Sequence, residues 1–144
     1  MKEMKFEFPI EGGDFINAGH ASSKVKKILN QLNISPVLVR RIAVATYEAE
    51  VNVVAHAFKG IMKVIISPSH ITVRVEDEGP GIPDINKAME EGFSTASEKV
   101  REMGFGAGMG LSNMKKNTDS MEIHSRINEG TVVEMKTWLN KENG

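Results

Sequence analysis

The sequence predicts an α+β fold, a two-layer sandwich in which helices cover one face of a mixed, mostly antiparallel sheet. Segments with strand-type alternation and segments with helical periodicity follow each other in the order β-α-α-β-β-loop-α-β-β. The chain has 144 residues, a length that suits one domain with a core of its own. Neither an internal repeat nor a low-complexity linker divides it, so we expect a single domain over residues 1–144.

The first half of the chain predicts one strand and two helices. Residues 4–10 alternate apolar and polar side chains and end at a pair of glycines, as a half-buried strand does. Asp14 then offers an N-cap for a helix whose apolar residues recur every three or four positions. Ser35 and Pro36 fit the cap and first position of a second helix, which we expect to run until Gly60.

The second half predicts two hairpins around a glycine-rich loop. Residues 77–83 are too rich in glycine and proline to continue a strand, and residues 93–105 lack a regular period. The expected elements are, in order, a strand at 61–67, a turn at 68–69, a strand at 71–75, a short helix at 84–91, a mobile loop at 93–105, a helix at 108–116, and strands at 121–127 and 131–139 joined by a turn at 128–130.

Composition excludes several classes of protein. With 18 basic and 19 acidic side chains, a net charge of -1 gives no basic field for nucleic acid or an anionic membrane. The absence of cysteine excludes disulfides, thiolate catalysis and cysteine-ligated zinc. The aliphatic runs are far shorter than the roughly 18 residues of a membrane span. The start is not typical of a signal peptide, so we expect a cytoplasmic protein.

The first candidate for chemistry is a polar face on the second helix. Glu48, Asn52 and His56 are spaced four residues apart, so they share one side of a helix. A carboxylate and a carboxamide one turn apart offer a general base and a hard oxygen ligand for Mg²⁺. The alternative is an ordinary polar edge of an amphipathic helix.

The second candidate is Asp77-Glu78-Gly79-Pro80-Gly81, which follows a predicted strand. A carboxylate at a strand end can accept a hydrogen bond from an exocyclic amine such as that of adenine. The glycines would let the backbone approach a flat ring closely or adopt a positive φ. A plain β-turn has the same residue types and remains the alternative.

The third candidate is a run of alternate glycines, Gly104, Gly106, Gly108 and Gly110, ahead of a predicted helix. Successive backbone N–H groups in such a run can bind phosphate oxygens. The spacing fits neither the Rossmann fingerprint nor the P-loop, because the third Rossmann glycine falls on Met109 or Leu111 and no glycine here precedes a lysine. A flexible hinge is the alternative.

The order of these motifs resembles the GHKL (Bergerat-fold) ATPases. The N box is Glu48-x-x-x-Asn52, the G1 box is Asp77-x-Gly79-x-Gly81, and the G2 box is Gly106-x-Gly108-x-Gly110, with Gly130-Thr131 opening a later strand. Within this superfamily the chain is similar to the anti-sigma factor and switch-protein serine kinases. The runs 76–85 and 89–95 and the ending 128–139 are most like those of the RsbT-type kinases.

The resemblance implies roles for these residues. Glu48 would be the catalytic base that polarises the attacking hydroxyl, and Asn52 would ligate the Mg²⁺ that bridges the phosphates of ATP. Asp77 would hold the adenine amino group, and residues 93–105 would form a lid over the nucleotide. The other implied nucleotide contacts are Gly79, Gly81, Gly106, Gly108, Gly110, Leu111 and Thr131.

The chain departs from the family in two places, the start of the G2 box and the lid, where the stretch 96–103 is longer than in the RsbT-type proteins. Anti-sigma members carry an arginine just before the glycines of the G2 box, where this chain has Gly106. Lys99 or Arg101 would supply a cation for the γ-phosphate, or both are solvated surface charges.

The function implied is an Mg-ATP-dependent serine/threonine kinase that phosphorylates a small STAS-type anti-sigma-factor antagonist. A sigma factor is a further implied partner, and a homodimer is possible because family members often dimerise. The alternative is a non-catalytic, ATP-dependent binding module that sequesters a sigma factor or regulates another enzyme.

Overall fold

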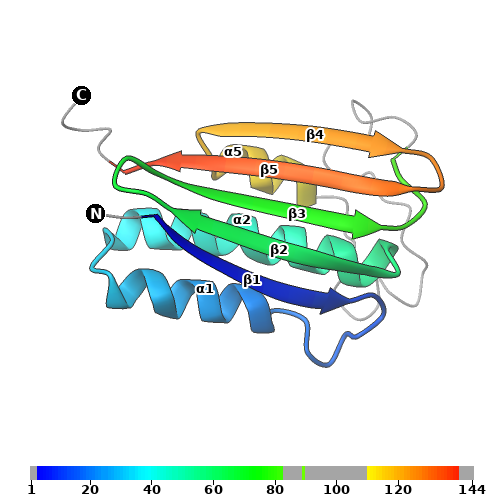
Figure 1. Ribbon diagram of the computed structural model, residues 1–144, viewed down its shortest axis with the longest axis horizontal. Coiled ribbons are helices and arrows are strands. Elements are labelled where there is room, and N and C mark those ends of the chain that lie inside the picture. The colour runs from blue at the N-terminus through cyan, green and yellow to red at the C-terminus, as the bar shows by residue number, and fades with distance from the viewer. Residues whose placement is uncertain (1–2, 83–88, 90–109, 140–144) are drawn as a thin grey trace.

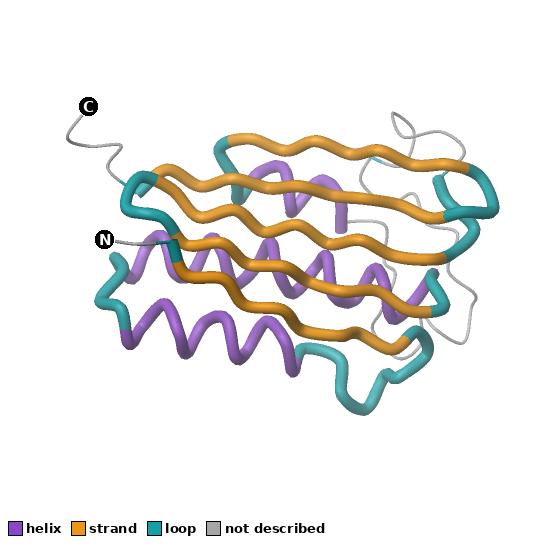
Figure 2. Tube along the Cα trace, in the orientation of Figure 1, coloured by secondary structure: helices purple, strands orange, loops and turns teal. Residues whose placement is uncertain are grey.

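The computed structural model describes residues 3–82, 89 and 110–139, which form two layers (Figure 1). A five-stranded sheet in the order β1-β2-β3-β5-β4 makes one layer, and the helices lie together on one of its faces (Figure 2). The α+β fold is therefore confirmed, but all four neighbouring strand pairs in the described part are antiparallel rather than mixed. The described elements are β1 (Met4–Glu11), α1 (His20–Gln31), α2 (Pro36–His56), β2 (Lys59–Ile66), β3 (His70–Glu78), α5 (Gly110–Lys116), β4 (Ser120–Arg126) and β5 (Gly130–Trp138).

The core lies between the sheet and the helices. Apolar side chains on one face of each strand meet those of the helices, because alternate residues of a strand point to the same face. Met62, Met114 and Met135 are all buried there, where a flexible thioether side chain fills irregular space. Other fully buried members are Leu29, Val53, Val64, Ile66 and Ile71.

The opposite face of the sheet is open and carries ion pairs. Lys63 Nζ lies 2.6 Å from a carboxylate oxygen of Glu76, and Arg74 Nη1 donates to Glu134 Oε2 at 3.0 Å. The hydrogen bond from Lys63 is the main reason that the pKa of Glu76 lies below its usual value, and nearby Arg74 adds to the effect. Lys63 and Arg74 stand opposite each other on β2 and β3, and glutamates on the same and neighbouring strands pair with them.

The first helix begins later than its sequence predicts. Asp14 does not cap it: both carboxylate oxygens of Asp14 accept hydrogen bonds from Asn17, at 3.3 and 2.9 Å, within the preceding loop. Helix α1 starts at His20, after Gly19 in the left-handed conformation. Asp14 therefore stabilises a turn before the helix, and the prediction that it caps α1 was wrong. The cap of α1 comes from a residue distant in sequence.

That cap is Glu50, a buried residue of α2. Its side chain accepts hydrogen bonds from the backbone N–H groups of Ala21, at 3.1 Å, and Ser22, at 2.9 Å. These are two of the N–H groups that the first turn of a helix leaves without an internal partner. A carboxylate is also favoured near the positive end of the helix dipole. Glu50 thus holds the start of α1 against the middle of α2.

The second helix also ends earlier than expected. Ser35 and Pro36 occupy the predicted cap and first positions, but α2 ends at His56 and Gly60 belongs to β2, paired with Asp77. Strand β3 likewise continues to Glu78, past the predicted break at residue 77. The interpretation of Gly60 as a helix stop was wrong, because its close packing against the β3 backbone, with Glu76 O 3.0 Å from the place of a Cβ, explains the glycine instead.

Several predictions fall outside the described residues. They are most of the short helix expected at 84–91, the loop at 93–105, and the first two residues of the helix expected at 108–116. Both predicted hairpins are confirmed, in β2–β3 and β4–β5. Among the helices described, none is long and apolar enough to cross a membrane.

Candidate functional site

The glutamate of the first motif lies where α2 meets α5. Glu48 is half-buried on α2, and Asn113 of α5 donates from Nδ2 to Glu48 Oε1 at 3.4 Å. The Cα of Gly110 is so close that a Cβ there would lie 3.5 Å from Glu48 Oε2. The first residue of α5 and a carboxylate of α2 are therefore neighbours, although 62 positions separate them in sequence.

The rest of the polar face lies further along the same continuous helix. Asn52 and His56 are partly buried, whereas the intervening Val53 and Val54 are in the core. Burial lowers the pKa of His56, so its imidazole is neutral at pH 7. Glu48, Asn52 and His56 thus form a polar row between core and solvent that ends at the C-terminus of α2.

The carboxylate of the second motif lies at the end of β3. Asp77 Oδ1 accepts a hydrogen bond from the backbone N–H of Thr131, the second residue of β5, at 3.0 Å. Partial burial raises the pKa of Asp77, and the Thr131 hydrogen bond opposes part of that rise. Among the described residues, no hydrogen-bond donor reaches Oδ2, the second carboxylate oxygen.

A small network supports this end of the sheet. Thr131 is buried, and its hydroxyl lies 2.9 Å from Ser125 Oγ on the neighbouring strand β4. Ser125 Oγ also accepts the backbone N–H of Ile82 at 2.7 Å, which ties down the segment that follows the G1 box. The network therefore fixes the start of β5, which donates to Asp77, and the turn that follows β3.

Two glycines are required by the backbone at this end. Gly81 has φ +81°, and a Cβ there would come within 2.5 Å of Arg126 O. Gly130 has φ +145°, and a Cβ there would overlap the carbonyl oxygen of Asp77. Any side chain at either position would push apart the turn and the strand ends, so the glycines keep three chain segments in close contact.

The sequence-predicted residues divide into those that the structure describes and those that it does not. Gly79 is buried against Ala57, just after α2, and this contact brings the G1 box next to the end of the N-box helix. Gly110 opens α5, and Leu111 is buried in the core, with 7% of its surface exposed. Gly106, Gly108, Lys99 and Arg101 lie outside the described residues.

All described site residues belong to one end of the molecule. Figure 1 shows the end of β3, the start of β5, the C-terminal end of α2 and the start of α5 at the same end of the two layers. The packing of Gly79 on Ala57 and of Gly110 near Glu48 connects these elements. On the helices, the arrangement offers the Asn52 carboxamide oxygen, which can ligate a metal ion, and the Glu48 carboxylate, which can act as a base. At the strand ends it offers the Asp77 carboxylate as a hydrogen-bond acceptor.

Sequence reasoning missed two residues of this site. Asn113 contacts Glu48, and Ser125 links Thr131 to the turn. Helical spacing places Asn113 one turn after Gly110 and so on the same face. The observed β4–β5 register places Ser125 opposite Thr131. The predicted turn at 128–130 would instead place it opposite Val133, so only Asn113 had a signal in the pattern.

Comparisons with known proteins agree with this geometry. The family model described as the histidine kinase-like ATPase domain matches residues 16–137. An anti-sigma F factor of Thermoanaerobacter sp. (strain X514) is 35% identical over 128 residues, covering 85% of this chain and 86% of the relative. The serine/threonine-protein kinase RsbT of Bacillus subtilis (strain 168) is 32% identical over 118 residues, covering 79% of this chain and 83% of the relative.

Solved structures share the fold. The mycobacterial sensor histidine kinase MprB superposes with a TM-score of 0.54 at 16% identity, over 92% of this chain and 97% of that one. A chain of the SiaB–SiaC complex from Pseudomonas aeruginosa gives a TM-score of 0.52 at 11% identity, over 94% and 89% of the two chains. At these identities the likeness concerns the fold alone.

Proposed function

Because the chain belongs to the histidine kinase-like ATPase family, we propose that it binds Mg-ATP and is a serine/threonine kinase. Its substrate in this proposal is a small STAS-type antagonist protein of a partner-switching system. The observation that carries the proposal is the meeting of Glu48 with the start of α5 at the same end of the fold as the Asp77–Thr131 pair. The names of the two curated relatives, an anti-sigma F factor and a serine/threonine-protein kinase, support this choice within the family.

The residues at the strand ends fit an adenine ring. Asp77 keeps one oxygen on the Thr131 N–H, which leaves Oδ2 to accept a hydrogen bond from the exocyclic amine. Gly79 and Gly81 keep side chains out of the adjoining turn, so that a flat ring can approach the backbone. A partly buried acceptor in this position selects a ligand with an amine, because a buried acceptor without a donor is costly.

The residues of α2 fit a hard metal ion and a hydroxyl nucleophile. Asn52 supplies a neutral oxygen ligand of the kind that Mg²⁺ accepts alongside phosphate oxygens and water. Glu48 is half-buried and held by Asn113, so its carboxylate has a restricted orientation. His56, neutral at pH 7, adds no charge to this row.

The chain's own contribution to phosphoryl transfer is positioning and proton acceptance. ATP supplies the phosphoryl group, and Mg²⁺ neutralises charge on its phosphates when bound. Glu48 accepts the proton of the substrate serine or threonine hydroxyl, a role worth roughly 10²–10⁴-fold in rate. Asn113 orients Glu48 for this step, and Asp77 fixes the nucleotide at the other end of the site.

The direct test is transfer of labelled phosphate from ATP to STAS-domain proteins of the source organism, each produced separately. Transfer to serine or threonine of at least one of them supports the proposal. ATP binding without transfer to any of them contradicts the kinase part.

The metal role of Asn52 has its own test. We expect Asn52→Ala to weaken Mg-dependent ATP binding in calorimetry by about 10–100-fold, as for the loss of other residues that support a metal site. The matched control is Asn30→Ala, at an exposed position of α1. Equal affinities of wild type and Asn52→Ala would contradict the metal role.

A sigma factor is a second candidate partner, because several relatives carry the name anti-sigma F factor. In that case ATP acts as a conformational ligand of a binding module. Glu48→Ala separates the two functions: a kinase loses control of its partner, whereas a binding module keeps it.

A further inference from the structure

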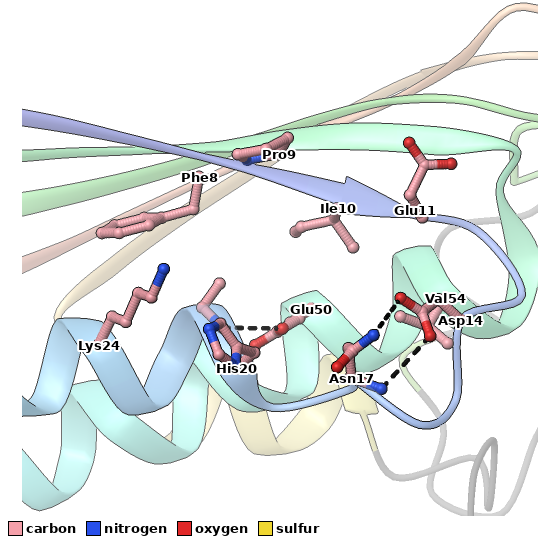
Figure 3. Close-up of a pocket in the computed structure, with 11 residues that line it drawn as sticks. Phe8, Pro9, Ile10, Glu11, Asp14, Asn17, His20, Lys24, Glu50 and Val54 are labelled. Atoms are coloured by element: carbon pink, nitrogen blue, oxygen red, sulfur yellow. Dashed lines mark hydrogen bonds between the residues drawn. The ribbon is translucent and has the colours of Figure 1, made fainter.

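The carboxylates of two regions differ in what they leave for a ligand. In the cavity of about 270 Å³ between β1 and α1 (Figure 3), Asp14 accepts two hydrogen bonds from Asn17, and Glu50 accepts backbone N–H groups at the start of α1. At the strand ends, the hydrogen bond that Asp77 accepts within the described residues goes to Oδ1. The protons of the neighbouring hydroxyl groups decide what this second region can bind.

Ser125 lies at the centre of three contacts at the strand ends. Its Oγ accepts the backbone N–H of Ile82 at 2.7 Å, donates to the carbonyl oxygen of Gly130 at 3.2 Å, and lies 2.9 Å from Thr131 Oγ1. A serine hydroxyl has one proton and two lone pairs. The N–H of Ile82 takes one lone pair, and the carbonyl oxygen of Gly130 takes the proton. All three contacts are therefore hydrogen bonds only when the Thr131 hydroxyl donates to the other lone pair of Ser125.

This arrangement commits both donors of Thr131 to the protein. Its hydroxyl donates to Ser125, and its backbone N–H donates to Asp77 Oδ1 at 3.0 Å. Thr131 is 5% exposed, so a hydroxyl proton without an acceptor would be costly there. What Thr131 and Asp77 still offer are the lone pairs of Thr131 Oγ1 and of Asp77 Oδ2, and all of these are acceptors.

We infer that Ser125 is a positioning residue that makes the strand-end part of the site selective for a ring bearing an amine. Because Ser125 holds the Thr131 proton, the acceptors that remain fit the exocyclic amine of adenine and oppose the carbonyl group of a 6-oxo purine. Ser125 also keeps the turn after β3 against β4 through the Ile82 N–H. The inference rests on the proposed function, since it concerns the nucleotide that this site binds.

The test compares the affinities of ATP and inosine triphosphate, which carries a carbonyl group in place of the amine. Ser125→Ala releases the Thr131 hydroxyl, whose proton can then turn toward that carbonyl group. We expect calorimetry to show ATP affinity reduced by about threefold to tenfold, the range for one lost hydrogen bond. The preference for ATP over inosine triphosphate should fall by about tenfold, because the released hydroxyl favours the second nucleotide.

Three further variants make the measurement specific. Ser125→Thr keeps the hydroxyl and should retain the wild-type preference, whereas Ser125→Cys keeps the size with a weak acceptor and should lower the preference as Ser125→Ala does. Ser120→Ala makes the same change at the other end of β4 and should leave both affinities unchanged. Without nucleotide, hydrogen exchange at the Ile82 amide should be about tenfold faster in Ser125→Ala and unchanged in Ser120→Ala.

A purely structural role of Ser125 predicts a different result. Both nucleotides would then lose affinity equally in Ser125→Ala, and this unchanged preference would contradict the inference. A wild-type protein that binds the two nucleotides equally, a loss of preference in Ser125→Thr, or an equal effect of Ser120→Ala would also contradict it. ATP binding by the wild type with an unchanged preference in Ser125→Ala leaves the proposed function intact, whereas a wild type that binds neither nucleotide contradicts both.

Discussion

The two sides of α2 use the same residue type in opposite ways. On the side toward α1, Glu50 is 3% exposed and both of its carboxylate oxygens accept backbone N–H groups. On the side toward α5, Glu48 is half-buried and accepts one longer hydrogen bond from Asn113. A separation of two residues turns a side chain by about 200° around a helix, so Glu48 and Glu50 meet different neighbours.

The difference shows how one helix serves both stability and chemistry. Both oxygens of the Glu50 carboxylate accept backbone N–H groups of α1 and the side chain is buried, so Glu50 acts as a cap that joins two helices. Glu48 keeps lone pairs available and lies beside the start of α5, as a base must. Three predictions test this division and a fourth tests the other end of the site, from the largest expected effect to the smallest.

Glu48→Ala should remove activity while leaving the fold intact. We expect phosphate transfer to fall by about 10²–10⁴-fold, because the general base is lost. The free energy of unfolding should change by less than about 1 kcal/mol, since Glu48 is half-buried and its hydrogen bond within the described residues is 3.4 Å long. Single-turnover transfer and urea unfolding measure the two quantities, and ATP affinity measured by calorimetry is the control for an intact nucleotide site. Wild-type transfer by this variant would refute the assignment of the base.

Glu50→Ala should lower the stability of the fold and leave phosphate transfer by the folded protein unchanged. It leaves the N–H groups of Ala21 and Ser22 buried without their acceptors, which we expect to lower the free energy of unfolding by about 2–4 kcal/mol. Urea unfolding checks this, and hydrogen exchange should show faster exchange at the start of α1. A change below about 0.5 kcal/mol, the range of ordinary surface substitutions, would mean that Glu50 is not the cap.

Asn113→Asp should sharpen the comparison on the α5 side. A second negative charge next to Glu48 disfavours the ionised form of the base, so the acid limb of the pH–rate profile should move to higher pH. Asn117→Asp makes the same change just after the end of α5, where the Asn117 side chain donates to the Asn113 carbonyl oxygen, and should shift the profile less. Identical profiles for the two variants would place Asn113 outside the site.

The pH dependence of nucleotide binding should follow Asp77. Because burial raises its pKa, Asp77 takes up a proton at a higher pH than an ordinary aspartate does. ATP affinity should therefore fall as pH decreases through that raised pKa. As the pH falls through the same window, the contribution of Asp77 to the free energy of unfolding should rise. The reason is that the native chain binds the proton more readily than the unfolded chain. Calorimetry across pH 4–7 checks the affinity, and Asp77→Asn should remove this dependence.

Much of the fold could be predicted from periodicity. The alternation from Met4 to Ile10 and the buried row that includes Ile42, Ala45 and Ala49 reflect which face of each element is covered, and this depends on local spacing. The element ends were harder, because tertiary contacts decide them. Gly60 has the residue type of a helix stop, yet it lies in β2, where the neighbouring strand comes close.

The site was predictable where one segment carries the whole motif and not where two segments meet. The positions of Glu48, Asn52 and Asp77 follow from spacing along the chain. The cap made by Glu50 and the contact of Asn113 with Glu48 join residues 28 to 65 positions apart. Helical spacing puts Asn113 on the face of Gly110, but local spacing does not predict either of these pairings. Glu48 and Glu50 are the same residue type, so residue type alone does not separate their roles. The packing of α1 and α5 on α2 does separate them, because α1 contacts Glu50 and α5 contacts Glu48.

The most direct measurement compares Glu48→Gln and Glu50→Gln side by side, in urea unfolding and in single-turnover phosphate transfer from ATP to a STAS-domain protein. We expect Glu48→Gln to lower transfer by at least about 100-fold with an unchanged free energy of unfolding. Glu50→Gln should lower the free energy of unfolding by about 1–2 kcal/mol and leave transfer by the folded protein unchanged. Transfer at the wild-type rate by Glu48→Gln, or a loss of transfer by folded Glu50→Gln as large as that of Glu48→Gln, would contradict the division of roles on α2.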